Sequence, residues 1–368
     1  MKKIKILYTI NFVTSGGPTR VLLNQIYNLS KNEFDIYLLT IIDQNKKSMI
    51  SNLKKYGVKV IQLKIPKTLL GAILNRNLIV DEVLKINPDI IHTHGIVTSI
   101  ILSVSKIKCK KVTTIHNNVY EDYKLTYGNI KGNLIAKIHL KCLKNFDYIF
   151  CCSKTSYDII KDDFKNITYI RNGIDIPIMS KIKIKELRSK IRKELNINEK
   201  DIIYCYCGVL NKRKCVRELV DYFNKTLKDN EYFLIVGDGS EYINIKNQIK
   251  NHNIIMLGFK ENIYDYYYAS DVYVSNSSSE GFSISIIEAL SCNLLLFLSD
   301  IPSHKECFEI DNSYYIGETF NQDFKSKKDK ITLHKHQVNT KKFYEKNLTG
   351  QIMAQKYISY YKELLKNE

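Results

Sequence analysis

The amino-acid sequence predicts an α/β protein with two Rossmann-like domains, each a parallel sheet wrapped by helices. Three observations support this fold class. Short runs rich in β-branched and aromatic residues alternate with helical patterns, the alternation begins again near residue 200, and a turn-rich segment separates the two series. A length of 368 residues is also sufficient for two domains.

The first series of elements begins at the N-terminus. The predicted strands cover residues 4–10, 34–42, 58–63, 90–94, 111–115, 148–152 and 167–170. Helical patterns lie between most of these strands. The first predicted helix, 18–29, follows a pair of glycines and has Pro18 in its first turn, where a missing backbone N–H is tolerated.

The second series follows a linker. Asn-Gly and a proline within 171–177 indicate a turn, so we place the domain boundary there. The N-terminal domain covers 1–174 and the C-terminal domain covers 175–345. The predicted strands of the second domain are 201–207, 232–236, 254–257, 271–274 and 294–297. The last segment, 346–368, belongs to a long amphipathic helical pattern that runs from 343 to 365.

The composition excludes several classes of protein. Hydrophobic residues make up 44% of the sequence and the mean hydropathy is −0.23, which fits a large core and argues against disorder. The formal net charge of +18 favours anionic partners: nucleic acid, acidic lipid or phosphorylated substrates. No apolar run approaches the roughly 20 residues that span a bilayer, and the N-terminus lacks a signal-peptide pattern. We therefore expect a cytoplasmic protein.

Cysteine and histidine spacings predict no metal site. The nine cysteines include no C-x-x-C pair and their number is odd, which fits buried thiols in a reducing cytosol. His92 and His94, two apart on a predicted strand, form a candidate metal pair, but no acidic or cysteine partner is near them in sequence. We expect neither a metal nor another cofactor.

Two glutamates, Glu280 and Glu288, carry the strongest functional signal. They follow the predicted strand 271–274 and flank the start of a helical pattern, so Glu280 lies in a loop and Glu288 lies within the helix. Eight residues along an ideal helix rise about 12 Å. The free N–H groups of a helix start attract phosphate. One short segment thus offers contacts for the sugar, the diphosphate and the ribose of a sugar nucleotide.

The segment 280–289 reads E-G-F-x-x-x-x-x-E-A, and it resembles the signature of the retaining glycosyltransferases of family 4. The resemblance implies the GT-B fold, in which two Rossmann-like domains face a cleft and a C-terminal helix crosses back to the first domain. It also implies that the nucleotide-sugar donor binds mainly to the second domain. Glu280 is then the catalytic carboxylate, Glu288 binds the ribose, and backbone amides near Gly281, Phe282 and Ser283 hold the diphosphate.

A second group of candidate residues lies in the N-terminal domain. Gly16 and Gly17 form a loop at the carboxyl end of the first predicted strand, where ligands bind in open α/β sheets. This loop resembles the family's G-G-x-x-R loop, which implies a place near the donor phosphates. His116 ends a predicted strand and matches the family's histidine that contacts the donor sugar, so we assign it to the catalytic group.

The remaining donor-binding candidates come from the C-terminal domain. Segment 208–215 resembles the family's G-R-L-x-x-x-K-G, with Lys214 at the lysine that binds the diphosphate. Val209 stands where the family has arginine and Cys215 where it has glycine, and Arg213 is the candidate substitute cation. Gly258, Phe259 and Lys260 resemble the loop around the nucleotide base.

Together these features predict a retaining, metal-independent glycosyltransferase. We expect a UDP-sugar donor, a hydroxyl of a glycan or lipid-linked acceptor, and a role in bacterial capsule or lipopolysaccharide O-antigen synthesis. Segment 123–146 contains a basic amphipathic pattern, which fits either a solvated helix face or peripheral binding to the inner face of the plasma membrane. The alternatives are a GT-B sugar-nucleotide epimerase and a basic nucleic-acid-binding protein, although no nucleic-acid-binding motif is present.

Overall fold

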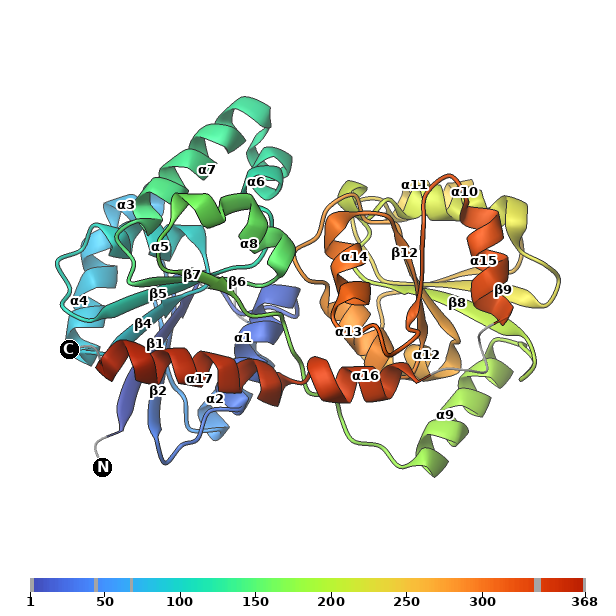
Figure 1. Ribbon diagram of the computed structural model, residues 1–368, viewed down its shortest axis with the longest axis horizontal. Helices are drawn as coiled ribbons and strands as arrows, with labels where there is room; N and C mark the ends of the chain where they lie inside the picture. Colours follow the sequence, from blue (N-terminus) through green and yellow to red (C-terminus); the bar gives the residue numbers. More distant parts are fainter. Residues whose placement is uncertain (1–2, 43–45, 67–68, 334–338, 367–368) are drawn as a thin grey trace. The chain divides into compact units, whose positions relative to one another are not determined.

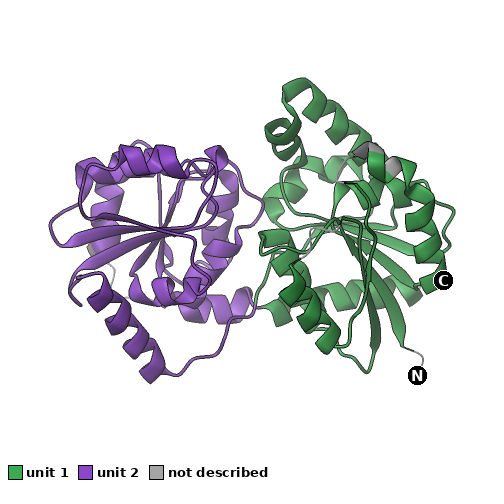
Figure 2. Cartoon of the chain, turned by 180° about the vertical axis from the view of Figure 1, so that it is seen from behind, with its two compact units in different colours: residues 1–174, 350–368 green, residues 175–349 purple. Residues whose placement is uncertain are grey.

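The computed structural model describes residues 3–42, 46–66, 69–333 and 339–366. The chain divides into two compact units, which Figure 2 colours separately. Unit 1 contains residues 1–174 and 350–368, and unit 2 contains residues 175–349. The chain therefore leaves unit 1 once and returns to it for its last helix.

Unit 1 is built on a seven-stranded parallel sheet with the order β3-β2-β1-β4-β5-β6-β7. The strands are β1 (Ile4–Ile10), β2 (Phe34–Thr40), β3 (Lys59–Gln62), β4 (Ile90–Thr93), β5 (Lys110–Ile115), β6 (Tyr148–Cys151) and β7 (Ile167–Tyr169). The order reverses between β1 and β4, as in doubly wound sheets, and the carboxyl ends of these two strands are the expected ligand site.

Helices cover both faces of this sheet (Figure 1). They are α1 (Gly17–Tyr27), α2 (Lys47–Lys55), α3 (Leu69–Leu74), α4 (Arg76–Ile86), α5 (Ile96–Ser103), α6 (Val119–Tyr127), α7 (Asn129–Leu143), α8 (Lys154–Ile160), the short 3₁₀ helix η1 (Lys161–Asp163) and α17 (Gly350–Lys366). Successive strand residues point to opposite faces. On β1, Leu7 packs in the cluster with α4 and α5, whereas Tyr8 contacts Tyr361 of α17.

Unit 2 repeats this architecture with a six-stranded parallel sheet, in the order β10-β9-β8-β11-β12-β13. The strands are β8 (Ile202–Cys207), β9 (Glu231–Val236), β10 (Ile254–Gly258), β11 (Val272–Ser275), β12 (Leu295–Ser299) and β13 (Gly317–Phe320). Its helices are α9 (Lys181–Glu194), η2 (Lys212–Lys214), α10 (Val216–Thr226), α11 (Tyr242–Gln248), α12 (Ile263–Ala269), α13 (Ile284–Ser291), α14 (Pro302–Glu309), α15 (Phe324–Leu333) and α16 (Thr340–Asn347).

The edge strand β13 was not among the predicted strands. It pairs with β12 through a close backbone approach at Gly317, where an added Cβ would lie 1.9 Å from the carbonyl oxygen of Leu296. Gly317 also has φ of +145°, which favours glycine. The strand is only four residues long, so its sequence carries little β signal.

The single C-terminal helix predicted over 343–365 is wrong, because the structure has two helices there. Helix α16 ends at Asn347 in unit 2 and α17 begins at Gly350 in unit 1. Leu348 leaves helical geometry with φ of −132°, and Thr349-Gly350 are poor helix formers. The amphipathic pattern continues through this break because both helices bury one face.

Helix α17 is fixed to unit 1 by buried hydroxyl groups as well as by apolar packing. The Tyr361 hydroxyl contacts Gln25 Nε2 at 2.6 Å and His92 Nδ1 at 2.5 Å, and the Tyr357 hydroxyl contacts Thr114 Oγ1 at 3.0 Å. Both tyrosines are buried. Buried polar groups of this kind specify one docking position, because any shift leaves several of them unpaired.

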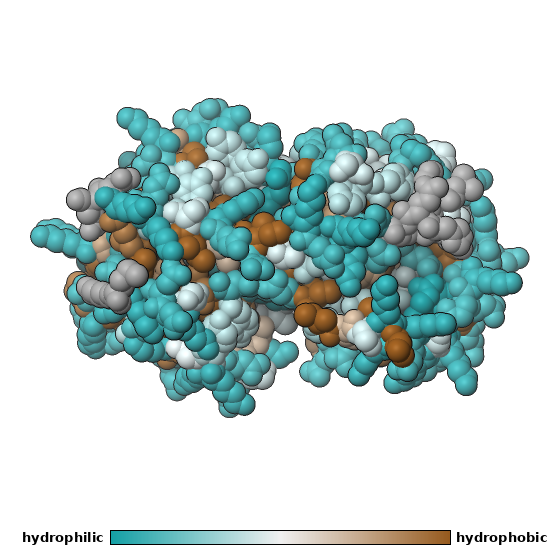
Figure 3. Space-filling model, turned by 60° about the horizontal axis from the view of Figure 1, so that its bottom comes forward, coloured by the Kyte–Doolittle hydropathy of each residue, from teal (hydrophilic) through white to brown (hydrophobic). Residues whose placement is uncertain are grey.

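The surface of the molecule is mostly hydrophilic in the view of Figure 3, where hydrophobic residues form small, separate patches. Within the described ranges, no helix has both the length and the apolar character needed to cross a bilayer.

Candidate active site

The candidate site in unit 2 lies where the strand order of its sheet reverses. Strands β8 and β11 are neighbours, and the chain continues from them into the loops 208–211 and 276–283. Parallel strands end at the same edge of a sheet, so these two loops meet there. Ser278 N–H donates to the carbonyl oxygen of Arg213 over 2.9 Å, which joins the second loop to η2.

The turn that carries the two candidate cations is held by local hydrogen bonds. Asn211 precedes η2 and its side-chain oxygen accepts from Lys214 N–H at 3.2 Å. Cys215 then takes left-handed geometry with φ of +47°. This is the position at which the family has glycine, so the chain keeps the backbone turn with a residue that is strained there by about 1 kcal/mol.

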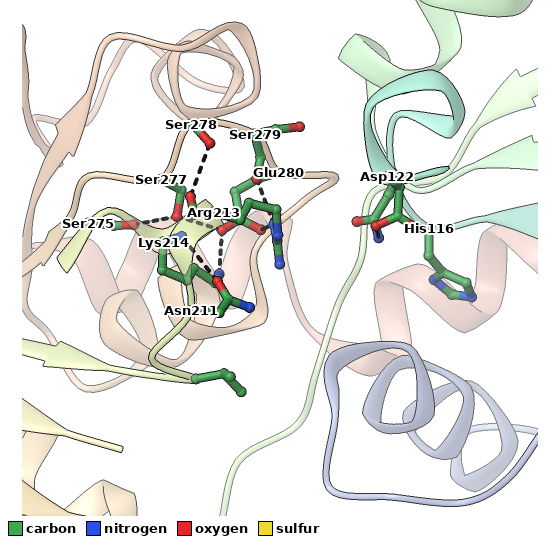
Figure 4. A network of polar contacts seen from close by, with 12 residues as sticks. His116, Asp122, Asn211, Arg213, Lys214, Ser275, Ser277, Ser278, Ser279 and Glu280 are labelled. Carbon is green, nitrogen blue, oxygen red and sulfur yellow. Dashed lines mark hydrogen bonds and ion pairs between the residues drawn. The ribbon is translucent and has the colours of Figure 1, made fainter. Parts of the chain in front are cut away.

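Glu280 lies at the centre of a buried polar cluster, shown in Figure 4. Its carboxylate forms ion pairs with Lys214 and with Arg213 Nη1, the latter at 2.9 Å. It also accepts a hydrogen bond from Ser277 Oγ at 2.7 Å. Arg213 donates in addition to the backbone oxygen of Ser279 at 2.6 Å. The structure thus brings together Glu280, Lys214 and Arg213, three residues predicted from sequence.

This cluster keeps Glu280 ionised. Burial alone would raise the pKa of a carboxyl group, and Glu280 is only 9% exposed. The nearby charges of Lys214 and Arg213 and the hydrogen bonds from Lys214 and Ser277 outweigh burial, and they lower the pKa of Glu280 to about 2. A negative charge is therefore held permanently beside two positive ones.

Glu288 lies in the second turn of α13 and is 1% exposed. The hydroxyls of Tyr264 and Tyr267 approach its two carboxylate oxygens, each at 3.3 Å. Tyr264 is partly exposed, whereas Tyr267 is fully buried. The two tyrosines come from α12, and sequence spacing gave no indication that they would meet Glu288.

The other donor-site candidates of unit 2 have mixed exposure. Phe259 is 61% exposed, and Lys260 lies over the Tyr266 ring at 5.9 Å from its centroid. Gly258 has φ of +69°. Val209, at the family's arginine position, is 58% exposed beside η2, so no side-chain cation is present there.

The start of α13 also belongs to this edge of the sheet. Ser283 is the N-cap of the helix and makes no side-chain capping bond, while Phe282 is buried in the core. Gly281 precedes them and follows Glu280 directly. The Phe282 side chain packs in the core and fixes the position of this segment. A phosphate would be bound here by backbone amides of the first helical turn.

In unit 1, Gly16 and Gly17 lie at the N-terminus of α1, after the carboxyl end of β1. Gly16 is the N-cap and has an ordinary extended backbone with φ of −71°. Glycine is therefore suited to this position by its small size and not by its conformational freedom. An added Cβ would come within 3.2 Å of Thr14 Oγ1, the atom that accepts from Gly16 N–H.

His116 follows β5 and forms a pair with another histidine. His94 Nδ1 and His116 Nε2 are 2.9 Å apart, and burial lowers the pKa of His116 to about 4. One nitrogen of the pair donates and the other accepts. His92 is bound on both ring nitrogens, by Tyr361 and Thr114. No group of three metal-binding side chains occurs among the residues that the structure describes.

Sequence reasoning missed the supporting residues of the site. Asn211 was detectable, because an asparagine three residues before Lys214 is typical of a cap. Ser277 was not, since a serine-rich run gives no indication of which hydroxyl meets a carboxylate. His94 was considered as a metal ligand but not as a partner of His116, because that contact depends on strand pairing.

Family models and known proteins match this chain over most of its length. The model for "Glycosyltransferase Family 4" matches residues 15–177, and that for "Glycosyl transferases group 1" matches residues 188–346. An O-antigen biosynthesis glycosyltransferase WclY of Escherichia coli is 28% identical over 318 residues, which is 83% of each chain. A UDP-Gal:alpha-D-GlcNAc-diphosphoundecaprenol alpha-1,3-galactosyltransferase of E. coli is 26% identical, covering 81% of this chain and 80% of that one.

Solved structures agree on the fold. Anabaena Alr3699/HepE in complex with UDP-glucose superposes with a TM-score of 0.77 at 16% identity, covering 99% of this chain and 100% of the other. Sucrose-phosphate synthase from Thermosynechococcus elongatus gives a TM-score of 0.79 at 15% identity, with 100% of both chains covered.

Two doubly wound parallel sheets, with the last helix returned to the first of them, are the arrangement of the GT-B fold. Because family models match both units in turn, the chain belongs to the glycosyltransferases of the group 1 and family 4 type. This result favours a transferase over the epimerase and nucleic-acid-binding alternatives.

Proposed function

We propose that this glycosyltransferase moves a sugar from a UDP-sugar to a hydroxyl group with retention of anomeric configuration, and that it needs no metal ion. The observation that carries the proposal is the cluster of Glu280 with Lys214 and Arg213 at the switch point of unit 2. Two fixed cations beside a carboxylate match the charges of a departing diphosphate and a developing positive sugar.

The cluster suggests how the cations act. In the free protein Lys214 and Arg213 are both paired with Glu280, whose single negative charge offsets one of their two positive charges. A bound diphosphate competes for the same cations, and amides at the start of α13 add donors. As the sugar–phosphate bond breaks, negative charge grows on the phosphate, so fixed cations stabilise the transition state more than the ground state. This is the work that a divalent ion performs in metal-dependent enzymes.

Glu280 then faces the sugar. Its permanent negative charge stabilises positive charge at the anomeric carbon, and its oxygens accept from sugar hydroxyls. In this proposal the acceptor oxygen attacks from the face on which the phosphate departs, and a phosphate oxygen takes the acceptor proton. The reaction therefore needs no covalent sugar–enzyme intermediate, and retention follows from attack on that face.

The acceptor and pathway are proposed from the relatives. One relative is named for O-antigen biosynthesis and another for transfer to a diphosphoundecaprenol-linked sugar. The same chemistry here gives a glycan or lipid-linked acceptor in bacterial surface polysaccharide synthesis. His116, Gly16 and Gly17 of unit 1 are the residues proposed to contact the donor sugar and phosphates.

The test is a donor and acceptor assay. Purified protein is incubated with UDP-glucose, UDP-galactose or UDP-N-acetylglucosamine as donor and with a lipid-linked glycan or a short glycan as acceptor. UDP release and product formation are measured with and without EDTA. We expect an α-linked product from an α-linked donor and equal rates with EDTA. A β-linked product would overturn retention, and full loss with EDTA that Mg²⁺ restores would overturn metal independence.

Glu288 gives a separate prediction about the ribose. Replacing Glu288 by glutamine should weaken UDP binding roughly tenfold, because a charged acceptor of the ribose hydroxyls is lost. The ribose must join or replace the Tyr264 hydroxyl at this carboxylate. Isothermal titration with UDP and with 2′-deoxy-UDP measures the effect. Glu288→Gln should reduce the preference for UDP over 2′-deoxy-UDP, and an equal loss for both nucleotides would contradict the ribose role.

The α6–α7 hairpin is the proposed membrane-contact surface of unit 1. On α7 the exposed apolar residues Ile130, Leu134 and Ile138 recur every four residues, and the helix contains no acidic residue. Lys137 and Lys141 are exposed on the same side of the helix. Figure 1 shows α7 reaching outward from the other helices of unit 1. A surface with apolar and basic residues together suits an anionic lipid interface.

This surface predicts salt-sensitive binding to lipid vesicles. Changing Lys137, Lys141 and Lys144 together to glutamate should weaken binding to phosphatidylglycerol vesicles at least about 10²-fold, since each basic residue near a surface contributes about 1 kcal/mol. A matched control reverses Lys181, Lys183 and Lys185 on α9, which are also exposed. Co-sedimentation at low salt measures both triple variants, and equal binding by the two would contradict the proposal.

A further inference from the structure

A chain of buried hydrogen bonds leads away from Glu280 into the core of unit 2. Ser277 Oγ donates to Glu280 Oε1 at 2.7 Å, and Ser299 Oγ donates to the backbone oxygen of Ser277 at 2.9 Å. His304 Nδ1 lies 3.0 Å from both Ser299 Oγ and the Ser299 backbone oxygen. Ser277, Ser299 and His304 are all buried.

The contacts of His304 fix its tautomer. A backbone oxygen only accepts, and Ser299 Oγ already donates its proton to Ser277, so His304 Nδ1 must carry the hydrogen. Burial lowers the pKa of His304 to about 4, which leaves the ring neutral at pH 7. Nε2 is then a bare acceptor, and it has no hydrogen-bond partner within the described part of the chain.

The location of this histidine connects it to the charge cluster. Burial is the main cause of the lowered pKa of His304, and the charges of Glu280 and Lys214 act on that pKa in opposite directions. His304 belongs to α14, an element to which sequence analysis assigned no function. The histidine supports the end of β12, and β12 in turn supports the loop that carries Glu280.

We propose that His304 is a positioning residue for Glu280 and acts through Ser299 and Ser277. This inference rests on the proposed function of Glu280. The hydrogen bond from His304 orients the Ser299 hydroxyl, the Ser299 hydroxyl fixes the Ser277 carbonyl, and the loop then presents Ser277 Oγ to the carboxylate. A catalytic group misplaced by about 1 Å loses up to about 10²-fold in rate.

The test compares two replacements of one side chain. The amide nitrogen of asparagine is as many bonds from Cα as His304 Nδ1, so His304→Asn keeps the donor to Ser299 whereas His304→Leu deletes it. We expect His304→Leu and Ser299→Ala to lower kcat roughly tenfold and His304→Asn to remain within about threefold. KM for the UDP-sugar and Kd for UDP should stay near the values of the unaltered protein. His252→Leu, at an exposed site, is the control.

Two further measurements separate positioning from general damage. Nitrogen-15 NMR of histidine-labelled protein should show the neutral Nδ1–H form of His304 at pH 7. The double variant Ser277→Ala with His304→Leu should lose little more than the worse single variant, because both act on one carboxylate. The proposal is overturned if His304→Asn is as slow as His304→Leu, or if His304→Leu has the same kcat as the His252→Leu control. It is also overturned if the proton of His304 is on Nε2. Full transfer by Glu280→Ala would instead overturn the proposed function.

Discussion

Replacing Glu280 by glutamine should reduce sugar transfer by about 10²- to 10³-fold, which is the usual effect of removing one fixed electrostatic group from an active site. Glutamine keeps the size of the side chain but removes its charge and replaces one accepting oxygen by an NH2 donor. UDP binding should be undiminished, because Lys214 and Arg213 no longer have Glu280 as a competing partner. Transfer rate and UDP affinity are measured on the same preparation.

The Glu280 prediction needs a check on folding, since the variant leaves two cations near each other without a counter-charge. Lys214 and Arg213 are 14% and 25% exposed in their side chains, so water relieves part of this repulsion. Thermal unfolding with and without UDP shows whether the diphosphate replaces the lost charge. A variant that folds, binds UDP and still transfers sugar at the normal rate would defeat the assignment of Glu280.

Replacing Lys214 by methionine should lower kcat/KM by about 10²-fold or more, because one of the two cations proposed to bind the diphosphate is lost from a partly buried position. UDP affinity should fall as well, unlike in the Glu280 variant. Lys212 is the matched control, since it lies in the same 3₁₀ turn but is exposed. Lys212→Met should behave as the unaltered protein does, and an equal loss in both variants would mean that only general positive charge matters.

The Lys214 variant also has a defined pH effect. In the unaltered protein Glu280 has a pKa of about 2, below its ordinary value of 4.5, so the stability from its ionisation is present above the ordinary value and is lost only as pH falls toward 2. Without Lys214, burial acts against fewer opposing charges and the pKa rises. The acid limb of the kcat/KM profile should therefore move to higher pH in Lys214→Met and stay in place in Lys212→Met.

Much of the fold was predictable because parallel strands are apolar runs bounded by turns. Strand β1 begins and ends where the sequence predicted, and both sheets contain the predicted strands in doubly wound order. The edge strand β13 was missed because four residues around one glycine carry little β signal. The break at Leu348 was missed because an amphipathic pattern indicates only which residues are buried. Helices α16 and α17 each bury one face, so the pattern of buried residues continues across the break.

The candidate site was predictable in its residues but not in its pairings. Glu280, Lys214 and Arg213 were named from a motif, yet their ion pairs depend on β8 lying beside β11, which brings residues 66 positions apart into contact. The same limit hid His304, because its link to Glu280 passes through two serines of different elements. Motifs report which groups are needed, whereas sheet topology decides which groups touch.

The return of α17 to unit 1 has a consequence for dissecting the protein. The Gly173 N–H lies 3.2 Å from Met353 Sδ, so the two chain ends of unit 1 at the crossing are close in space. Residues 175–349 are therefore an insertion in unit 1, and the chain segments on either side of the insertion lie close together. Truncation after residue 174 removes α17 and with it the Tyr361 hydroxyl, so His92 loses the partner of Nδ1 and keeps only Thr114 at Nε2. A spliced chain that joins residues 174 and 350 by a short peptide keeps α17 on unit 1, and it is the form in which unit 1 is separable for study.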